Sequence, residues 1–251
     1  MPSFSSEGIE IAYEVFGDGK PIVFVHGFGS NARTNWGVTG WIETVNQAGY
    51  RAVVYDNRGH GHSQKLYDPA LYPTQLMAHD ALNLLDHLGI EQAAFVGYSM
   101  GARISTYAGI TAPDRVAAVV LGGMGIKMVT GIGGAQEIVT ALRAPSLADV
   151  TTPVGRQYRI FAEYTHSDLE ALATCMEAGR EIVPESMARQ LKVPALVAVG
   201  SDDDVGGPPE PLAALFEKGE SLVIPRRDHM RATGDKTFKA GVLDFLKRVD
   251  W

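Results

Sequence analysis

Cysteine is nearly absent from this chain of 251 residues, in which Cys175 is the only one. A single cysteine cannot form an intramolecular disulfide, so nothing in the sequence points to an oxidising compartment. The chain also lacks any apolar run near the roughly 18 residues that a membrane span needs. Residues 1–16 have neither the basic nor the apolar segment of a secretion signal. We therefore expect a cytoplasmic protein without a membrane partner.

An excess of basic residues is missing as well. Acidic residues outnumber basic ones by 29 to 22, and the formal net charge of −7 argues against nucleic acid or an anionic membrane as partner. The apolar share of 45% and the charged share of 20% are ordinary for a soluble enzyme, and the length suits one large domain. The sequence leaves the oligomeric state open.

Alternating strand-like and helix-like segments predict an α/β protein with a mostly parallel, doubly wound sheet. The predicted strands cover residues 9–15, 21–25, 51–55, 93–96, 116–121, 195–199 and 221–224, and the predicted helices cover residues 35–48, 74–88, 102–112 and 236–249. The segment 123–194 contains helical patterns but no convincing strand. We expect it to form a short helical cap, inserted after the sixth strand of a core made of residues 1–122 and 195–251.

The Gly-Tyr-Ser-Met-Gly motif at residues 97–101 lies between a predicted strand and a predicted helix. Gly-x-Ser-x-Gly in this position is typical of a nucleophile elbow, whose strained turn exposes the serine hydroxyl and whose glycines let strand and helix approach closely. Ser99 is therefore the candidate nucleophile. A serine hydroxyl needs a base within hydrogen-bonding distance, and that base needs a third group to orient it.

Candidates for the acid and the base follow the last two predicted strands. Asp202, Asp203 and Asp204 come directly after the first of these strands, and any of the three could supply the carboxylate. His229 comes just after the second. Both loops lie at the carboxyl edge of the predicted sheet, where Ser99 is also expected.

Together these motifs resemble the α/β-hydrolase superfamily over nearly the whole chain. Besides the elbow and the two loops, the resemblance rests on His-Gly-Phe-Gly at residues 26–29 and on Asp-Asn-Arg-Gly-His-Gly-His-Ser at residues 56–63. In this superfamily the serine is followed along the chain by the acid and then by the histidine, an order that His229 satisfies. The acid loop usually reads Gly-x-x-Asp, a register that favours Asp203.

The resemblance also implies that the backbone N–H groups of Phe28 and Met100 form the oxyanion hole. We expect Trp36, Met124 and Met230 to line a mainly apolar substrate cleft under the cap. The protein is then a serine hydrolase that cleaves an ester-like bond of a small acyl substrate through an acyl-enzyme, without a metal or organic cofactor. For aryl esters we expect the rate to rise from acetyl to butyryl or hexanoyl and then to fall.

Other functions stay open at this point. A serine at the elbow disfavours the haloalkane dehalogenase and epoxide hydrolase branches, whose reactions need a carboxylate nucleophile. A lactonase, a thioesterase or a carbon–carbon bond hydrolase would share the triad, and a ligand receptor of the superfamily would retain it without turnover. Arg103 gives the elbow a likeness to a lyase of menaquinone biosynthesis, and the cap arginines Arg143, Arg156 and Arg159 could turn inward and select acidic acyl groups.

Overall fold

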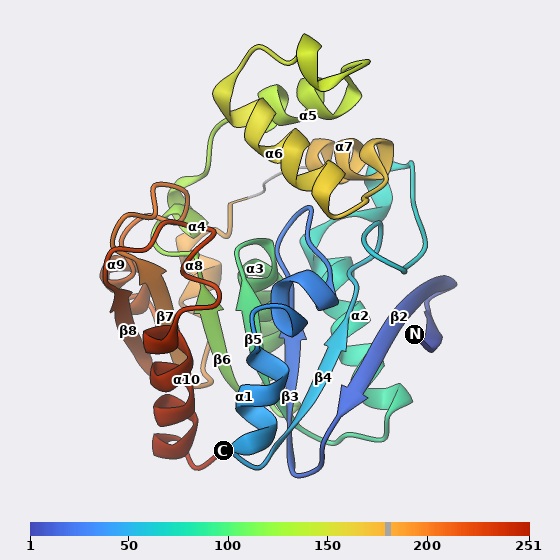
Figure 1. Cartoon of the computed structure of the whole chain (residues 1–251). Coiled ribbons are helices and arrows are strands. Elements are labelled where there is room, and N and C mark those ends of the chain that lie inside the picture. Colours follow the sequence, from blue (N-terminus) through green and yellow to red (C-terminus); the bar gives the residue numbers. More distant parts are fainter. Residues whose placement is uncertain (179–181) are drawn as a thin grey trace.

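A single eight-stranded sheet forms the centre of the computed structural model, which describes residues 1–178 and 182–251 (Figure 1). The strands are β1 (Ser3–Ser6), β2 (Ile9–Phe16), β3 (Lys20–Val25), β4 (Tyr50–Tyr55), β5 (Ala93–Tyr98), β6 (Val116–Gly122), β7 (Ala195–Gly200) and β8 (Gly219–Ile224). Their order across the sheet is β1-β2-β4-β3-β5-β6-β7-β8. The pairs β1–β2 and β2–β4 are antiparallel, and the pairs from β4–β3 to β7–β8 are parallel. The predicted α/β fold is therefore confirmed.

Helices cover both faces of the sheet (Figure 1). The longer core helices are α1 (Trp41–Gln47), α2 (Thr74–His87), α3 (Met100–Thr111) and α10 (Lys236–Arg248). Buried side chains of α1 and α10 pack in one apolar cluster with one face of the strands, and those of α2 and α3 pack in a second cluster with the other face. Because it is covered on both faces, β5 is buried at every position, which explains its continuous apolar sequence.

Two local features differ from the predicted elements. The short strand β1 was not predicted, because four residues are too few to show a clear period. The helix predicted over residues 35–48 is divided into a π-helical turn at Arg33–Gly37 and α1. Gly40 precedes α1 with a φ of 74°, a conformation that interrupts a right-handed helix and that glycine adopts without strain.

Between β6 and β7 the described residues form helices only: α4 (Lys127–Thr130), α5 (Ala135–Arg143), α6 (Pro153–Tyr164), α7 (Leu169–Glu177) and α8 (Glu185–Ala188). Figure 1 shows α5, α6 and α7 stacked above the carboxyl ends of the strands, as a cap would be. These three helices have a small apolar core of their own. Residues 179–181 of the predicted cap lie outside the described part of the chain.

Within the described residues, none of the helices has the length and apolar character needed to cross a lipid bilayer.

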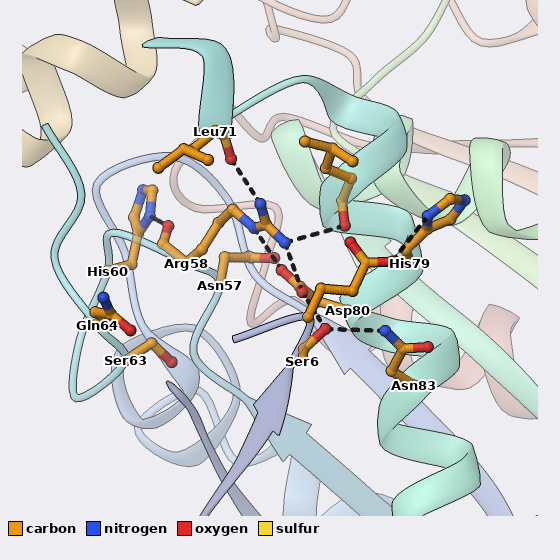
Figure 2. Close-up of polar contacts among 12 residues, drawn as sticks. Ser6, Asn57, Arg58, His60, Ser63, Gln64, Leu71, His79, Asp80 and Asn83 are labelled. Atoms are coloured by element: carbon orange, nitrogen blue, oxygen red, sulfur yellow. Dashed lines mark hydrogen bonds and ion pairs between the residues drawn. The ribbon is translucent and has the colours of Figure 1, made fainter. Parts of the chain in front are cut away.

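A buried ion pair ties the loop after β4 to α2 (Figure 2). The Arg58 guanidinium donates to both carboxylate oxygens of Asp80 at 2.7 Å, and the two side chains are each 1% exposed. Arg58 also donates to the Leu71 carbonyl at 2.7 Å, and the Ser6 hydroxyl donates to Asp80 at 2.5 Å. The Asn83 amide in turn donates to the Ser6 hydroxyl. The network therefore joins β1, α2 and the loop that follows β4.

Candidate active site

Ser99 occupies a sharp turn between β5 and α3. Its φ of 55° and ψ of −111° lie in a region that residues other than glycine seldom adopt. The turn is possible because Gly97 and Gly101 lack side chains. A Cβ atom on Gly97 would collide with the Gly101 carbonyl, and one on Gly101 would collide with the carbonyl of Val25 at the end of β3. This is the geometry expected of a nucleophile elbow.

His229 and Asp203 lie beside the elbow in a hydrogen-bonded chain. The His229 Nε2 is 3.0 Å from the Ser99 hydroxyl, and its Nδ1 is 2.8 Å from an oxygen of Asp203. Because a carboxylate only accepts, Nδ1 donates to Asp203 and Nε2 is left to accept from Ser99. The other Asp203 oxygen accepts from the backbone N–H groups of Val205 and Gly206 at 2.9 Å. The structure thus brings together the three residues predicted as a triad.

The neighbouring aspartates are placed differently. The Asp203 side chain is fully buried, whereas Asp202 and Asp204 are exposed at the surface. Asp202 accepts a hydrogen bond from the Ser201 hydroxyl. Of the three candidates left by the sequence, only Asp203 is in contact with the imidazole.

The Tyr98 hydroxyl contacts the backbone of His229. It donates to the His229 carbonyl at 2.5 Å, and the two rings are 5.5 Å apart. Burial raises the pKa of Tyr98, so the phenol remains a donor at physiological pH.

The loop after β3, which holds Phe28, is fixed by buried polar contacts. The His26 imidazole donates from Nδ1 to the Gly27 carbonyl at 2.8 Å and accepts at Nε2 from the Asn57 N–H at 2.9 Å. The Gly27 N–H donates to the side-chain oxygen of Asn35 at 3.1 Å. These bonds hold the loop beside the first residue of α3, Met100, whose N–H is the second predicted oxyanion donor.

Two buried histidines lie under this loop. The centroids of the His26 and His60 rings are 5.2 Å apart, and the His60 and Phe28 rings form a T-shaped pair with centroids 5.8 Å apart. Burial lowers the pKa of His26 to about 4. Burial, together with the neighbouring His26, lowers the pKa of His60 to about 3. Both rings are therefore neutral at physiological pH and serve the loop as packing and hydrogen-bonding groups.

Two cavities meet at Ser99. The larger has a volume of about 440 Å³ and is bounded by His229, Met230 and helix α6 of the cap. The smaller has a volume of about 40 Å³ and lies on the side of Met100. Phe28, Ser99, Tyr158 and Val205 line both.

One of the three predicted cleft residues lines a cavity and two do not. Met230 lines the larger cavity, and 47% of its surface is exposed. The expectation for Trp36 and Met124 was wrong, because both are fully buried in the core away from either cavity. Trp36 packs against Phe24 and Trp41. From the same turn, Asn35 faces the cavity instead, a direction that the sequence pattern did not reveal.

The cap supplies most of the residues that sequence reasoning missed. Five residues of α6 line the larger cavity: Gln157, Tyr158, Ile160, Phe161 and Tyr164. Their spacing of three or four residues was the available signal, but it does not tell which side of an inserted helix faces the core. Just after α6, the Thr165 hydroxyl donates to the Gly29 carbonyl at 2.8 Å and so links the cap to the Phe28 loop.

The cap arginines act within the cap and do not line the cavities. Arg159 is 5% exposed and donates to the carbonyls of Ala141 and Ala144 at the end of α5. Arg143 pairs with Glu170 and with a second glutamate of α7. Arg156 donates to backbone carbonyls of the α5–α6 connection. Arg103 differs, because it is buried and lines the smaller cavity.

Among the described residues there is no cluster of His, Cys, Asp or Glu that could ligate a metal ion.

Comparison with known proteins decides the family. A profile of the alpha/beta hydrolase fold matches residues 20–128. A non-heme haloperoxidase of Rhodococcus erythropolis is 34% identical, with 97% of this chain and 98% of that protein aligned. The chain belongs to the α/β-hydrolase fold family. The resemblance inferred from the sequence motifs is therefore confirmed.

Two further α/β-hydrolase matches differ in extent. The non-heme chloroperoxidase CPO-A1 of Kitasatospora aureofaciens is 35% identical, but the match spans 46% of this chain and 40% of that protein. The enol-lactonase of Burkholderia xenovorans LB400 superposes with a TM-score of 0.79 over 98% of this chain and 100% of the other, at 24% identity. The second match supports the fold over the whole length of this α/β-hydrolase.

Proposed function

We propose that this protein is a serine hydrolase that cleaves an ester-like acyl bond of a small-molecule substrate. The observation that carries the proposal is the chain of contacts from Ser99 to His229 to Asp203, with separations of 3.0 and 2.8 Å. In such a chain the carboxylate orients the imidazole, and the imidazole removes the proton of the serine hydroxyl. Membership of the α/β-hydrolase family supports hydrolysis as the reaction type.

The reaction proceeds in two halves. The Ser99 oxygen forms a bond to the substrate carbonyl carbon while its proton passes to His229 Nε2. The N–H groups of Phe28 and Met100 donate to the resulting oxyanion. Each such donor raises the rate by roughly 10²–10³. The bond to the leaving oxygen then breaks, and that oxygen takes the proton from His229. In the second half His229 deprotonates a water, whose oxygen forms a bond to the acyl carbon. The bond from that carbon to Ser99 then breaks, the Ser99 oxygen takes the proton from His229, and the acid is released.

Covalent labelling tests this proposal. A fluorophosphonate should add once per chain with loss of fluoride, the adduct should map to Ser99 by peptide mass spectrometry, and Ser99→Ala should remain unlabelled. With excess p-nitrophenyl acetate the wild-type protein should release many equivalents of p-nitrophenol. Release that stops after about one equivalent would favour a triad-retaining receptor, and absence of the adduct would contradict the proposal.

A second candidate activity comes from the R. erythropolis relative, which is named a non-heme haloperoxidase. Attack of hydrogen peroxide instead of water on the same acyl-enzyme would yield a peracid, which oxidises bromide to hypobromous acid and returns the carboxylic acid. Bromination of monochlorodimedone in acetate buffer with peroxide and bromide measures this reaction. Because it uses the same acyl-enzyme, Ser99→Ala should abolish it.

A further inference from the structure

Ser99 separates two cavities of very different size, of about 440 and about 40 Å³. His229, Met230 and Thr233 belong to the larger cavity only. The smaller cavity is lined instead by Met100 and by residues that include Met77, Arg103, Ile132 and Met176. The two spaces therefore adjoin at the proposed nucleophile, and only the larger is bounded by the base.

The position of the base determines which part of an ester enters which cavity. After attack by Ser99, the leaving oxygen must receive a proton from His229 Nε2, the atom that lies 3.0 Å from the Ser99 hydroxyl. The leaving group consequently lies on the His229 side, in the larger cavity. The carbonyl oxygen faces the N–H groups of Phe28 and Met100. The remaining substituent, the acyl chain, is directed toward the smaller cavity.

The volumes of the two cavities then limit the sizes of the acyl and alcohol parts of the ester. Each water-sized group needs about 10–15 Å³ of such space, so the smaller cavity has room for about three heavy atoms and the larger for about thirty. Three carbons beyond the carbonyl correspond to a butyryl chain. A hexanoyl chain, which the sequence-based expectation still included, is too long.

The lining of the larger cavity indicates the chemistry of the leaving group. Phe28, Ile160, Phe161, Tyr164 and Met230 present aromatic or aliphatic surface. Ile160, Tyr164 and Met230 are 49%, 68% and 47% exposed, so apolar surface continues to the mouth of the cavity. Contact with an apolar leaving group would cover this surface, at about 25 cal/mol per Å² removed from water.

We propose that the protein is selective for esters that join a short acyl chain, acetyl to butyryl, to a bulky apolar alcohol. The inference rests on the proposed serine-hydrolase function and assigns the two sides of that site. The proposal predicts that moving the bulky group from the alcohol part to the acyl part of an ester prevents efficient cleavage.

Two isomeric esters test the assignment directly. Naphthalen-2-ylmethyl acetate has the bulky group in the alcohol, and methyl naphthalen-2-ylacetate has it in the acyl part. We expect kcat/KM to favour the first by at least about tenfold, the lower end of what a misfit in an apolar pocket costs. Equal rates, a preference for the methyl ester or failure to cleave the acetate would overturn the proposal. If Ser99 is still labelled by a fluorophosphonate in those cases, the serine-hydrolase function stands; absence of labelling would overturn both.

A matched pair of variants tests the same assignment from the protein side. Ile132 lines only the smaller cavity and Ile160 only the larger. In Ile132→Ala the ratio of kcat/KM for p-nitrophenyl hexanoate to that for the acetate should rise by about tenfold, with little change in the preference among acetates of different alcohols. In Ile160→Ala the preference for naphthalen-2-ylmethyl over ethyl acetate should fall, with the acyl-length profile kept. The opposite pairing of variant and effect would show that the assignment is reversed.

Discussion

At the scale of single residues, Ser99 is held in a backbone conformation that an L-residue adopts at a cost. With a φ of 55° and a ψ of −111°, the strain amounts to about 1–3 kcal/mol. We expect Ser99→Ala to lose activity and keep this strain, and Ser99→Gly to lose activity but unfold at a higher temperature than Ser99→Ala. A difference of about 1 kcal/mol corresponds to about 2–4 °C for a chain of this size. Calorimetry of the two variants measures it, and a melting temperature of Ser99→Gly below that of Ser99→Ala would contradict the strain argument.

The acid loop allows a test with built-in controls. Asp203 alone among the three neighbouring aspartates contacts His229 and is buried. Asp203→Asn should lower kcat/KM by about 10³–10⁴, because the imidazole loses the group that fixes its tautomer. Asp202→Ala and Asp204→Ala should stay within several-fold of the wild-type protein. A comparable loss in either control would assign the carboxylate role to that neighbour.

At the scale of elements, the Arg58–Asp80 pair connects the loop after β4 with α2 (Figure 2). Removing one partner leaves a buried charge without compensation, so Arg58→Met and Asp80→Leu should each lower the free energy of unfolding by about 3–5 kcal/mol. The double variant Arg58→Met/Asp80→Leu should lose less than the sum of the two. Urea unfolding measures all three, and the exposed pair Lys192–Glu217 is the control, for which Lys192→Met should cost about 1 kcal/mol or less. Strict additivity at positions 58 and 80 would contradict direct coupling.

How far the sequence predicts each element depends on what surrounds it. The strands β3 to β7 are buried at most of their positions, so their composition alone predicts them, and the elbow motif predicts the turn at Ser99 from local sterics. The direction in which α6 faces depends on how the cap packs on the core, a contact between segments far apart in the chain. For the same reason Trp36 was expected in the cleft and lies in the core, while Asn35 beside it faces the cavity.

At the scale of the whole molecule, two buried histidines make stability depend on pH. In the folded protein the pKa values of His26 and His60 lie at about 4 and about 3, and in the unfolded chain a histidine titrates near 6.5. As the pH falls below about 6.5, the unfolded chain binds protons that the folded protein does not, so each histidine removes about 1.4 kcal/mol of stability per pH unit until its folded pKa is reached. The stability that depends on these two neutral histidines is therefore fully present above about pH 6.5 and declines below it.

Urea unfolding between pH 7 and pH 5 measures this dependence. His60→Gln should reduce the slope of unfolding free energy against pH by about 1.4 kcal/mol per unit in the steep region. His79→Gln, a change at a half-exposed histidine beside Glu7, is the control and should leave most of the slope in place. A slope unaffected by His60→Gln would contradict a buried neutral ring at that position.

The hydrogen bond from Thr165 to the Gly29 carbonyl, 2.8 Å long, joins the end of α6 to the residue after Phe28. In the proposed reaction α6 would contact the leaving group and the Phe28 N–H would face the oxyanion, so this bond would couple the two, although more than a hundred residues separate them along the chain. A leaving group that filled the larger cavity would hold α6, and with it the Gly29 carbonyl, in one position. A poorly fitting one allows both to move. In this arrangement the fit of the leaving group would control the alignment of the Phe28 N–H with the oxyanion. The choice between substrates would then affect the turnover step as well as binding.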